Sequence, residues 1–563
     1  MNDLVSPPLN RPDELAFLAL GGVGEIGMNL SLYGYAGRWL MIDCGITFAD
    51  DTMPGVEVLM ADPAFIVERR DELVGLVATH AHEDHIGAIA YLWPRLKCPI
   101  YATPFTAAVL RAKLAEAGLE QEAPITEVAM SGRFTVGPFE LELITLTHSI
   151  PEPNAVALRT PLGTVLHTGD WKFDPEPLIG PAADMAALER LGDEGVLAMV
   201  CDSTNAMRPG TAGSEADVRR ALTDLIGRCP NRVVVACFAS NVARLETAAL
   251  AAQTHDRQVG LIGRSLWRME QAARDTGYLR DVPRFLTEEE AAYLPRDKVL
   301  LLCTGSQGEA RAALPRIAAD EHAHIVLEPG DTVIFSSRVI PGNERAIGRL
   351  QNALVRLGVE IITDNDHFVH VSGHPAQDEL TRMYRAVRPR IAVPVHGEAR
   401  HLQAQAQLAE ACAVPQTIVT RNGQMVKLAP GPAAVIGEVH TGRLVADGKA
   451  LIDSSSETLK SRQRMTFNGA AMVTVVIDDA GRLVAPPQVS VQGLAEGNVA
   501  TDAALVRKVA EAVGDLSARE RGDDEAVREA ARVAVRRELR ARHNKRPVLE
   551  VHVVRLGRAG RAG

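Results

Sequence analysis

The sequence contains few cysteines and no closely spaced pair of them. Its seven cysteines are an odd number, spread from Cys44 to Cys412 without a Cys-x-x-Cys pair. This pattern argues against a disulfide framework and a cysteine-ligated zinc site, and it favours reduced thiols in a cytoplasm. The sequence also lacks an apolar run near the ~18 residues that a membrane helix needs, and residues 1–15 lack the apolar core of a secretory signal. We therefore expect a cytoplasmic chain with no membrane association.

An excess of positive charge is also absent. The chain carries 60 Lys and Arg against 71 Asp and Glu, a net charge of −11. This balance argues against a general nucleic-acid coat. It leaves room for a focused basic channel or a metal-centred site, because two bound dications would invert the local field. At 563 residues the chain is long enough for two or three domains.

Histidine is concentrated in one short stretch, His80-Ala81-His82-Glu83-Asp84-His85. An apolar strand end precedes it and an Ile-Gly-Ala-Ile-Ala run follows, which predicts a strand, a tight loop and a helix start. Imidazole and carboxylate groups suit zinc, and a short loop can aim several of them at one point. Adjacent side chains point in different directions, so the loop could feed two metals. The alternative is a polar surface loop rich in histidine, which the strict alternation and the strand–loop–helix context disfavour.

Further polar residues follow predicted apolar strands elsewhere. Asp43 follows Trp39–Ile42, His148 follows Leu141–Leu146, Asp170 follows Thr164–His167 and His396 follows Ile391–Val395. Each alone is more often structural. Together with the histidine loop they become candidate ligands, Asp43 as a carboxylate that orients a metal-bound histidine and Asp170 as a bridge between two ions.

A Gly-x-Gly-x-x-Gly match occurs at residues 22–27. A dinucleotide site of this type needs a helix directly after the glycines. Two strands are predicted there instead, at residues 29–35 and 39–42. We therefore interpret the glycines as a tight turn beside another site.

The middle of the chain predicts a parallel α/β domain. Between residues 214 and 357 the pattern of strand, Ser- or Gly-rich loop and helix occurs four times. Such loops and helix N-termini favour anions, so a phosphate-rich ligand fits them. Small-residue turns that serve packing alone are the alternative.

The C-terminal part predicts a small α/β domain behind a linker. A hairpin is expected from residues 471–478 and 482–492, then helices at 502–513 and 523–542 and a strand at 548–556. Residues 519–546 hold ten Lys or Arg against six Asp or Glu. A solvated helix face is the default interpretation of this charge, with RNA contact or oligomerisation as alternatives.

The motifs together resemble a known family. The order Asp43, His80-x-His82-x-Asp84-His85, His148, Asp170 is similar to the metallo-β-lactamase superfamily. The α/β insert, with Asp202 before it and two histidines after it, resembles the β-CASP subgroup, which acts on nucleic acids. Five segments and the C-terminal part resemble the bacterial ribonuclease J family: Gly-Gly-Val-Gly-Glu-Ile-Gly, Thr-Gly-Asp-Trp-Lys, Phe-Ala-Ser-Asn, His-Val-Ser-Gly-His and Pro-Val-His-Gly-Glu. The resemblance covers nearly the whole chain.

The resemblance implies an α/β fold: a metallo-β-lactamase αββα core, an inserted parallel α/β β-CASP domain and a small C-terminal α/β domain. The implied parts are a flexible arm (1–14), the first part of the core (15–212), the insert (213–365), the second part of the core (366–453), a linker (454–470) and the C-terminal domain (471–563).

The resemblance also implies the ligands of two Zn²⁺ ions per subunit, with Mn²⁺ or Mg²⁺ as substitutes. One ion would be held by His80, His82 and His148, the other by Asp84, His85 and His396, with Asp170 bridging and Asp43 behind them. Structural Ca²⁺ is implied near Asp50 and near Asp447.

For the substrate, the resemblance implies that residues 370–374 grip an RNA phosphate. His374 would donate the proton to the leaving oxygen, with help from Asp84, and a histidine at position 396 favours RNA over DNA. The implied RNA contacts are Ala239, Ser240, Asn241, His370, Val371, Ser372, Gly373 and His374.

The implied function is a zinc-dependent ribonuclease acting on single-stranded RNA. It would be a 5′-to-3′ exonuclease that prefers 5′-monophosphate ends and also an endonuclease, in rRNA processing and mRNA decay. A homodimer or homotetramer and a place in an RNA-degradation complex are expected. The rival of a small thioester or lactone hydrolase explains the zinc ligands but not the insert, His374 or His396. An inactive scaffold protein is disfavoured because every proposed ligand is present.

Overall fold

The computed structural model describes residues 11–49, 52–494 and 503–556. The chain forms two compact units, one of residues 1–48 with 58–444 and one of residues 49–57 with 445–563. The predicted insert and most of the predicted core, except residues 49–57 and 445–453, thus lie within one unit. The boundaries between insert and core stay a prediction. No helix in the described ranges is long and apolar enough to cross a membrane.

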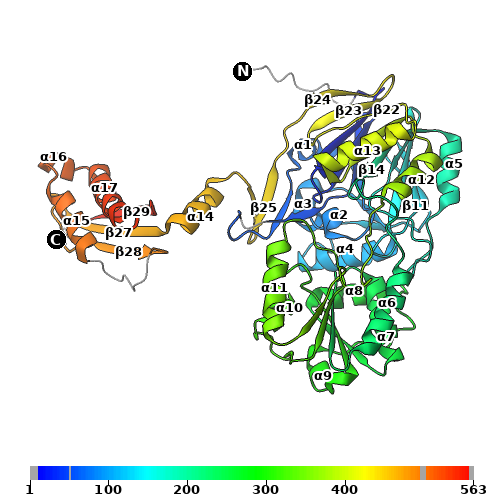
Figure 1. Cartoon of the computed structure of the whole chain (residues 1–563). Coiled ribbons are helices and arrows are strands. Elements are labelled where there is room, and N and C mark those ends of the chain that lie inside the picture. Colours follow the sequence, from blue (N-terminus) through cyan, green and yellow to red (C-terminus); the bar gives the residue numbers. More distant parts are fainter. Residues whose placement is uncertain (1–10, 50–51, 495–502, 557–563) are drawn as a thin grey trace. The chain divides into compact units, whose positions relative to one another are not determined.

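Two sheets packed face to face form the centre of the first unit (Figure 1). The first sheet has, in spatial order, β24 (Ala434–Glu438), β23 (Gln424–Ala429), β1 (Leu15–Gly21), β3 (Leu30–Tyr35), β4 (Arg38–Ile42), β7 (Leu73–Val77), β8 (Ile100–Ala102) and β9 (Ile125–Glu127). The second has β10 (Arg133–Val136), β11 (Phe139–Thr145), β12 (Asn154–Thr160), β13 (Gly163–His167), β14 (Val196–Asp202), β20 (Ile391–Val395) and β22 (Gln416–Thr417). Buried side chains from both sheets, such as Phe17, Leu40, Val156 and Val200, form one core cluster.

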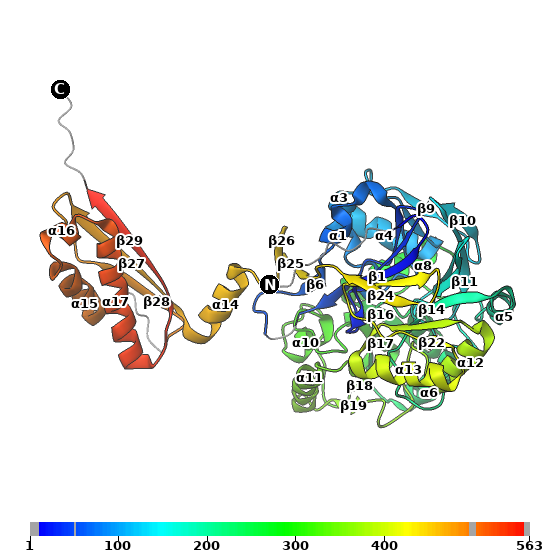
Figure 2. The ribbon, with the colours of Figure 1, turned by 90° about the horizontal axis from the view of Figure 1, so that it is seen from above.

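Helices cover the outer faces of these sheets. On the second sheet, apolar residues of α5 (Met185–Glu194), α12 (Gln377–Val387) and α13 (Ala399–Ala411) pack against β11 to β14 (Figure 2). On the first sheet, α4 (Pro104–Glu116) packs on β8 and β9. The remaining elements near the first sheet are β2 (Val23–Gly24), β5 (Ile46–Phe48), β6 (Val58–Ala61), α1 (Ala64–Val67), α2 (Glu83–Ile86), α3 (Ile89–Leu96) and β21 (Gly397–Glu398). The predicted αββα core is confirmed.

A further sheet, whose strands are all parallel, lies within the same unit. Its order is β16 (Gln258–Ile262), β17 (Val299–Cys303), β15 (Val233–Ala236), β18 (Thr332–Phe335) and β19 (Glu360–Ile362). Around it lie α6 (Glu215–Arg228), α7 (Val242–Thr254), α8 (Arg264–Asp275), α9 (Glu288–Ala292), α10 (Ala313–Ala318) and α11 (Glu344–Arg356). The strands are buried apolar runs rather than alternating ones, as expected for strands covered on both faces. The predicted parallel α/β insert is confirmed, and β19 is a strand that the sequence did not predict.

The second unit contains a three-stranded sheet with helices on one face. The sheet order is β28 (Gln488–Gln492), β27 (Ala470–Asp478) and β29 (Val548–Leu556), with α15 (Ala503–Gly514), α16 (Ala518–Arg521) and α17 (Asp524–His543). Val527, Ala531, Val535 and Leu539 recur every four residues on α17, and they pack against the buried positions of β27. β25 (Arg443–Asp447) and β26 (Ala450–Asp453) precede this part.

The segment predicted as a linker, residues 454–470, is mostly the helix α14 (Glu457–Asn468), which ends at Gly469 with φ +71°. Its role as a linker stays a prediction. The predicted strand 482–492 begins only at Gln488. Pro486 and Pro487 lack the N–H donors that a ladder needs, so pairing starts after them.

Candidate metal centre

All seven predicted ligands meet at one edge of the two-sheet core. His80 and His82 follow β7, and Asp84 and His85 lie in α2. The other three follow β11, β13 and β20 directly or within three residues. Their ligand atoms form two groups, each within 4.8 Å: His80, His82 and His148, then Asp84, His85, Asp170 and His396. A third group, Asp170, Asp202, His374 and His396, overlaps the second.

The first group consists of three neutral imidazoles. His82 Nδ1 lies 3.1 Å from His80 Nε2 and 3.0 Å from His148 Nε2. Burial lowers the pKa of His82 to about 4 and holds the pKa values of His80 and His148 well below the usual range. Neutral imidazole is the form that binds a metal. Three ring nitrogens this close fit a shared cation.

The second group contains the atoms that the fold leaves without partners. His85 Nε2 lies 3.1 Å from Asp170 Oδ2 and 3.6 Å from Asp84 Oδ2. His396 Nε2 lies 3.5 Å and 3.7 Å from the same two oxygens. Among the described residues, buried His396 Nε2 and Asp170 Oδ1 have no hydrogen-bond partner. Because unpaired buried polar atoms are costly, this arrangement fits a bound cation, and its nitrogen and carboxylate donors are those that zinc takes.

Asp43 lies behind the second group, as predicted. Its Oδ2 accepts hydrogen bonds from His85 Nδ1 at 2.7 Å and from Thr79 Oγ1 at 2.9 Å, and its Oδ1 accepts one from Thr79 N at 2.8 Å. A proton on His85 Nδ1 leaves Nε2 with its lone pair towards Asp84 and Asp170. Asp43 has φ +63°, a conformation rare outside glycine, held here by the three hydrogen bonds.

Asn29 has a matching role that the sequence analysis missed. Its Oδ1 lies 2.9 Å from His396 Nδ1, and its Nδ2 donates to the carbonyl of Asp84 at 3.0 Å. Asn29 comes two residues after Gly27, the last glycine of the turn, so the turn lies beside the proposed metal centre. The only sequence signal was an asparagine after that turn.

Two glycines allow the close approach of the ligand loops. A Cβ at Gly45 would lie 1.7 Å from the Asp84 carbonyl oxygen, and one at Gly373 would lie 2.6 Å from His148 Cε1. No side chain fits at either position. The ligand loop therefore packs directly on the backbone after β4, and residues 370–374 pack directly on His148.

His374 reaches the metal centre from this segment. Its Nδ1 lies 2.9 Å from Asp202 Oδ2 and 3.7 Å from Asp170 Oδ2. Burial lowers the pKa of His374, but the carboxylates of Asp202 and Asp170 outweigh it and raise the pKa to about 9. The two carboxylates therefore favour the protonated form of the His374 ring.

The other predicted RNA contacts lie farther from the ligands or have structural partners. Asn241 Oδ1 caps α7 by accepting from Arg244 N at 3.0 Å, so its side chain is engaged by the fold. Ser372 Oγ accepts from Asn205 Nδ2 at 2.8 Å. His370 is half-buried, and partial burial and Arg244 lower its pKa to about 3. Ala239 and Ser240 are partly exposed in the loop before α7, while Val371 and Gly373 are buried.

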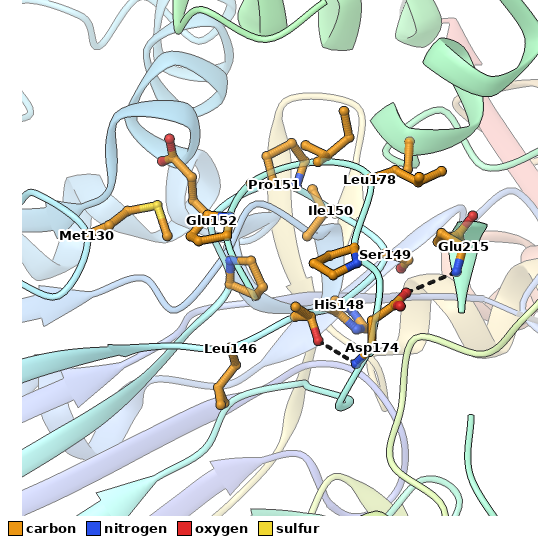
Figure 3. Close-up of a pocket in the computed structure, with 17 residues that line it drawn as sticks. Met130, Leu146, His148, Ser149, Ile150, Pro151, Glu152, Asp174, Leu178 and Glu215 are labelled. Carbon is orange, nitrogen blue, oxygen red and sulfur yellow. Dashed lines mark hydrogen bonds between the residues drawn. The ribbon is translucent and has the colours of Figure 1, made fainter. Parts of the chain in front are cut away.

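A pocket opens beside His148 and Ser149 (Figure 3). Its wall is largely proline and aliphatic, and Asp174 Oδ2 at its edge accepts from Glu215 N at 3.0 Å. Of the predicted site residues, His148 alone lines this pocket.

The described residues give little support to the predicted calcium positions. Asp447 pairs with Arg462 at 2.7 Å, and no potential metal group in the described ranges includes it. Asp50 lies outside the described residues.

Comparison with known families covers the chain almost from end to end. Residues 24–234 match the metallo-beta-lactamase superfamily, and residues 230–354 match the ribonuclease J beta-CASP domain. Residues 342–415 match a Zn-dependent metallo-hydrolase RNA specificity domain, and residues 457–556 match the ribonuclease J C-terminal domain.

Curated relatives agree with these matches. Ribonuclease J of Sinorhizobium meliloti is 46% identical over 97% of this chain and 98% of its own length. Ribonuclease J of Thermus thermophilus is 39% identical over 82% of each chain. A solved protein of unknown function from Enterococcus faecalis has a similar fold, with a TM-score of 0.53 and 16% identity over 74% of this chain and all of that one. The predicted resemblance is confirmed, and the chain belongs to the ribonuclease J family of metal-dependent ribonucleases.

Proposed function

We propose that the chain hydrolyses phosphodiester bonds of single-stranded RNA with two zinc ions, for which Mn²⁺ or Mg²⁺ can substitute. One ion is assigned to His80, His82 and His148, the other to Asp84, His85 and His396, with Asp170 shared. Support comes from the two groups of ligand atoms and from the unpaired Asp170 Oδ1 and His396 Nε2. When bound, such ions supply an activated water and a Lewis acid for the scissile phosphate.

His374 is the proposed proton donor to the leaving 3′ oxygen, with Asp84 assisting. The carboxylate of Asp202, 2.9 Å from Nδ1, favours the protonated form of the ring, which is the form that a proton donor needs. Asp202 orients the ring through Nδ1, which directs Nε2 away from that carboxylate. Asp84 keeps 31% of its side chain accessible, so it can reach a bound substrate.

The RNA backbone is assigned to residues 370–374 and 239–241. Ser372 and Ser240 are proposed to line a pocket for a 5′-monophosphate end, giving stepwise 5′-to-3′ digestion beside endonucleolytic entry. The match to an RNA specificity domain over residues 342–415 supports the assignment of residues 370–374, because that range holds this segment. The observation that carries the proposal is the approach of His374 Nδ1 to within 3.7 Å of Asp170 Oδ2, which joins the RNA-binding segment to the metal centre.

Wider roles follow from the same assignment. We assign the enzyme to rRNA processing and mRNA decay, as a homodimer or homotetramer within an RNA-degradation complex. A cytoplasmic location is supported by the seven cysteines, all free and six of them buried.

The test uses 5′-labelled RNA with monophosphate or triphosphate ends. His80→Ala with His82→Ala removes two ligands, and we expect cleavage to fall at least about 100-fold. A matched control is the tripeptide His322-Ala323-His324, which has the same His-Ala-His sequence but lies outside the proposed metal centre. His322→Ala with His324→Ala should keep the wild-type rate.

Two outcomes would contradict the proposal. Equal rates for wild type and the His80/His82 variant would refute the metal assignment. Hydrolysis of a lactone or thioester by protein that leaves RNA intact would favour the small-molecule hydrolase.

A further inference from the structure

Three cations surround His370, the first residue of the proposed RNA segment. Lys172, Arg244 and Arg338 all act on its ring. Two of them are neutralised within the protein. Buried Lys172 Nζ lies 2.9 Å from Asp174 Oδ2, and buried Arg244 Nη2 lies 2.9 Å from Glu215 Oε2. Their charge is therefore compensated in the fold.

Arg338 differs from the other two. It is exposed, and its side-chain hydrogen bond among the described residues is to a neutral group: Nη1 donates to Asn205 Oδ1 at 3.2 Å. Asn205 in turn donates from Nδ2 to Ser372 Oγ at 2.8 Å and to the His374 carbonyl at 3.0 Å. One amide side chain therefore links an uncompensated guanidinium to the segment assigned to the RNA phosphate.

The backbone that carries Arg338 is held from both sides. Buried Gln307 donates from Nε2 to the Arg338 carbonyl at 2.9 Å, and its Oε1 accepts from Ile340 N at 2.9 Å. On the other side, Ser336 Oγ donates to the Val369 carbonyl at 2.7 Å. Because this loop is fixed before any ligand arrives, little order has to be gained on binding.

We propose that Arg338 binds the 5′-terminal phosphate of the RNA and thereby sets the preference for a monophosphate end. This inference rests on the proposed function. The two side chains already assigned to the 5′-end pocket, Ser372 and Ser240, are neutral hydroxyls, which do not by themselves favour a dianion. A terminal phosphate monoester carries a charge of about −1.5 to −2 at neutral pH, and a guanidinium fork pairs with it in two parallel hydrogen bonds. A 5′-hydroxyl end offers Arg338 no such partner.

The experiment compares Arg338→Ala and Arg338→Lys with wild type on one RNA sequence carrying a 5′-monophosphate or a 5′-hydroxyl. Arg349→Ala is the matched control, since it removes an equally exposed arginine on the neighbouring α11. We expect Arg338→Ala to lower kcat/KM about tenfold or more on the monophosphate RNA and to leave the hydroxyl RNA unchanged. Arg338→Lys keeps the charge without the fork, so part of the preference should return.

Binding of the same two RNAs is measured alongside in EDTA, where no hydrolysis occurs. Wild type should bind the monophosphate RNA more tightly, and Arg338→Ala should bind both alike. An equal loss on both RNAs, or no loss on either, overturns the role of Arg338. A wild type that cleaves without regard to the 5′ end overturns the proposed end preference instead. Binding that still depends on the phosphate and on Arg338 would then uphold the phosphate contact.

Discussion

Replacing Asp43 by asparagine tests whether a buried carboxylate controls the metal centre through one histidine tautomer. Asp43 only accepts hydrogen bonds: from His85 Nδ1 and Thr79 Oγ1 at Oδ2, and from Thr79 N at Oδ1. An asparagine must place its NH₂ at one of these two positions. Facing His85, it favours the tautomer with the proton on Nε2, which removes the lone pair from the ligand group. If the NH₂ group faces Thr79 N instead, two hydrogen-bond donors meet and the hydrogen bond from Thr79 N is lost.

Each orientation of the asparagine has an expected effect on metal affinity or on folding stability. Loss of a carboxylate that orients a metal-binding histidine typically lowers metal affinity about 10- to 100-fold, equal to ~1.4–2.8 kcal/mol. A buried donor left unpaired costs about 1–3 kcal/mol of folding stability. We therefore expect the weaker-binding zinc to dissociate more readily from Asp43→Asn, beside a modest loss of stability.

The assay is a zinc titration against a chromophoric chelator, with thermal unfolding of the same samples in EDTA to separate stability from binding. Asp331→Asn is the control. Asp331 is also fully buried and accepts three hydrogen bonds, from Glu328 N and from two nitrogens of Arg296, but it lies in the insert. Unchanged zinc affinity in Asp43→Asn, or an equal loss in Asp331→Asn, would refute the tautomer argument.

Three further predictions use neighbouring contacts. Asp202→Asn removes the carboxylate that holds His374, so kcat on RNA should fall at least about tenfold with little change in KM; initial-rate kinetics check this, and an unchanged kcat would remove Asp202 from that role. Arg244→Ala leaves the buried Glu215 carboxylate without its ion-pair partner and should lower the free energy of unfolding by about 3–5 kcal/mol, as measured by denaturant unfolding. Burial raises the pKa of Glu215, but Arg244 outweighs burial and lowers it. The stabilisation from the Arg244–Glu215 pair is therefore present above about pH 4 and is lost as the pH falls further. A destabilisation by Arg244→Ala that stays the same at low pH would contradict this reasoning. Removal of zinc by EDTA should lower Tm, because zinc at about 100 times its Kd adds ~2.7 kcal/mol to the free energy of unfolding. Differential scanning calorimetry with and without EDTA tests this prediction.

The sequence predicted those features of the site that depend on local spacing. The histidine loop could be recognised because four of its ligands lie within six residues, and His148, Asp170 and His396 because each follows an apolar strand. Asn29 could not be recognised in the same way. Its hydrogen bond to His396 joins residues 367 positions apart, and an asparagine after a glycine turn usually serves the turn itself. Arg338 likewise follows an ordinary serine turn, and its proximity to Ser372 appears only when the insert is folded.

Fold-level predictions succeeded and failed for similar reasons. The amphipathic helices α15 and α17 were predicted to within one residue at each end, because their patterns are complete in themselves. The helix α14 was taken for a linker because its three leading serines outweighed the helix-forming residues behind them. The short strand β19 has only three residues, too few for a periodic pattern.

The insert also bears on the metal centre through one pair of strands. β14 ends at Asp202 just before the insert, and β20 begins at Ile391 after it. The two strands pair in parallel, with Asp202 opposite Val395, so His396 comes directly beyond that pair. The residue that holds His374 and the last ligand of the second group are thus placed by the same ladder. Pairing strands this far apart in sequence has a large entropic cost of loop closure, and a folded, compact insert lowers that cost by bringing the strand ends together. Folding of the insert therefore favours completion of the metal centre, and it places the segment proposed to bind RNA beside the proposed ligands.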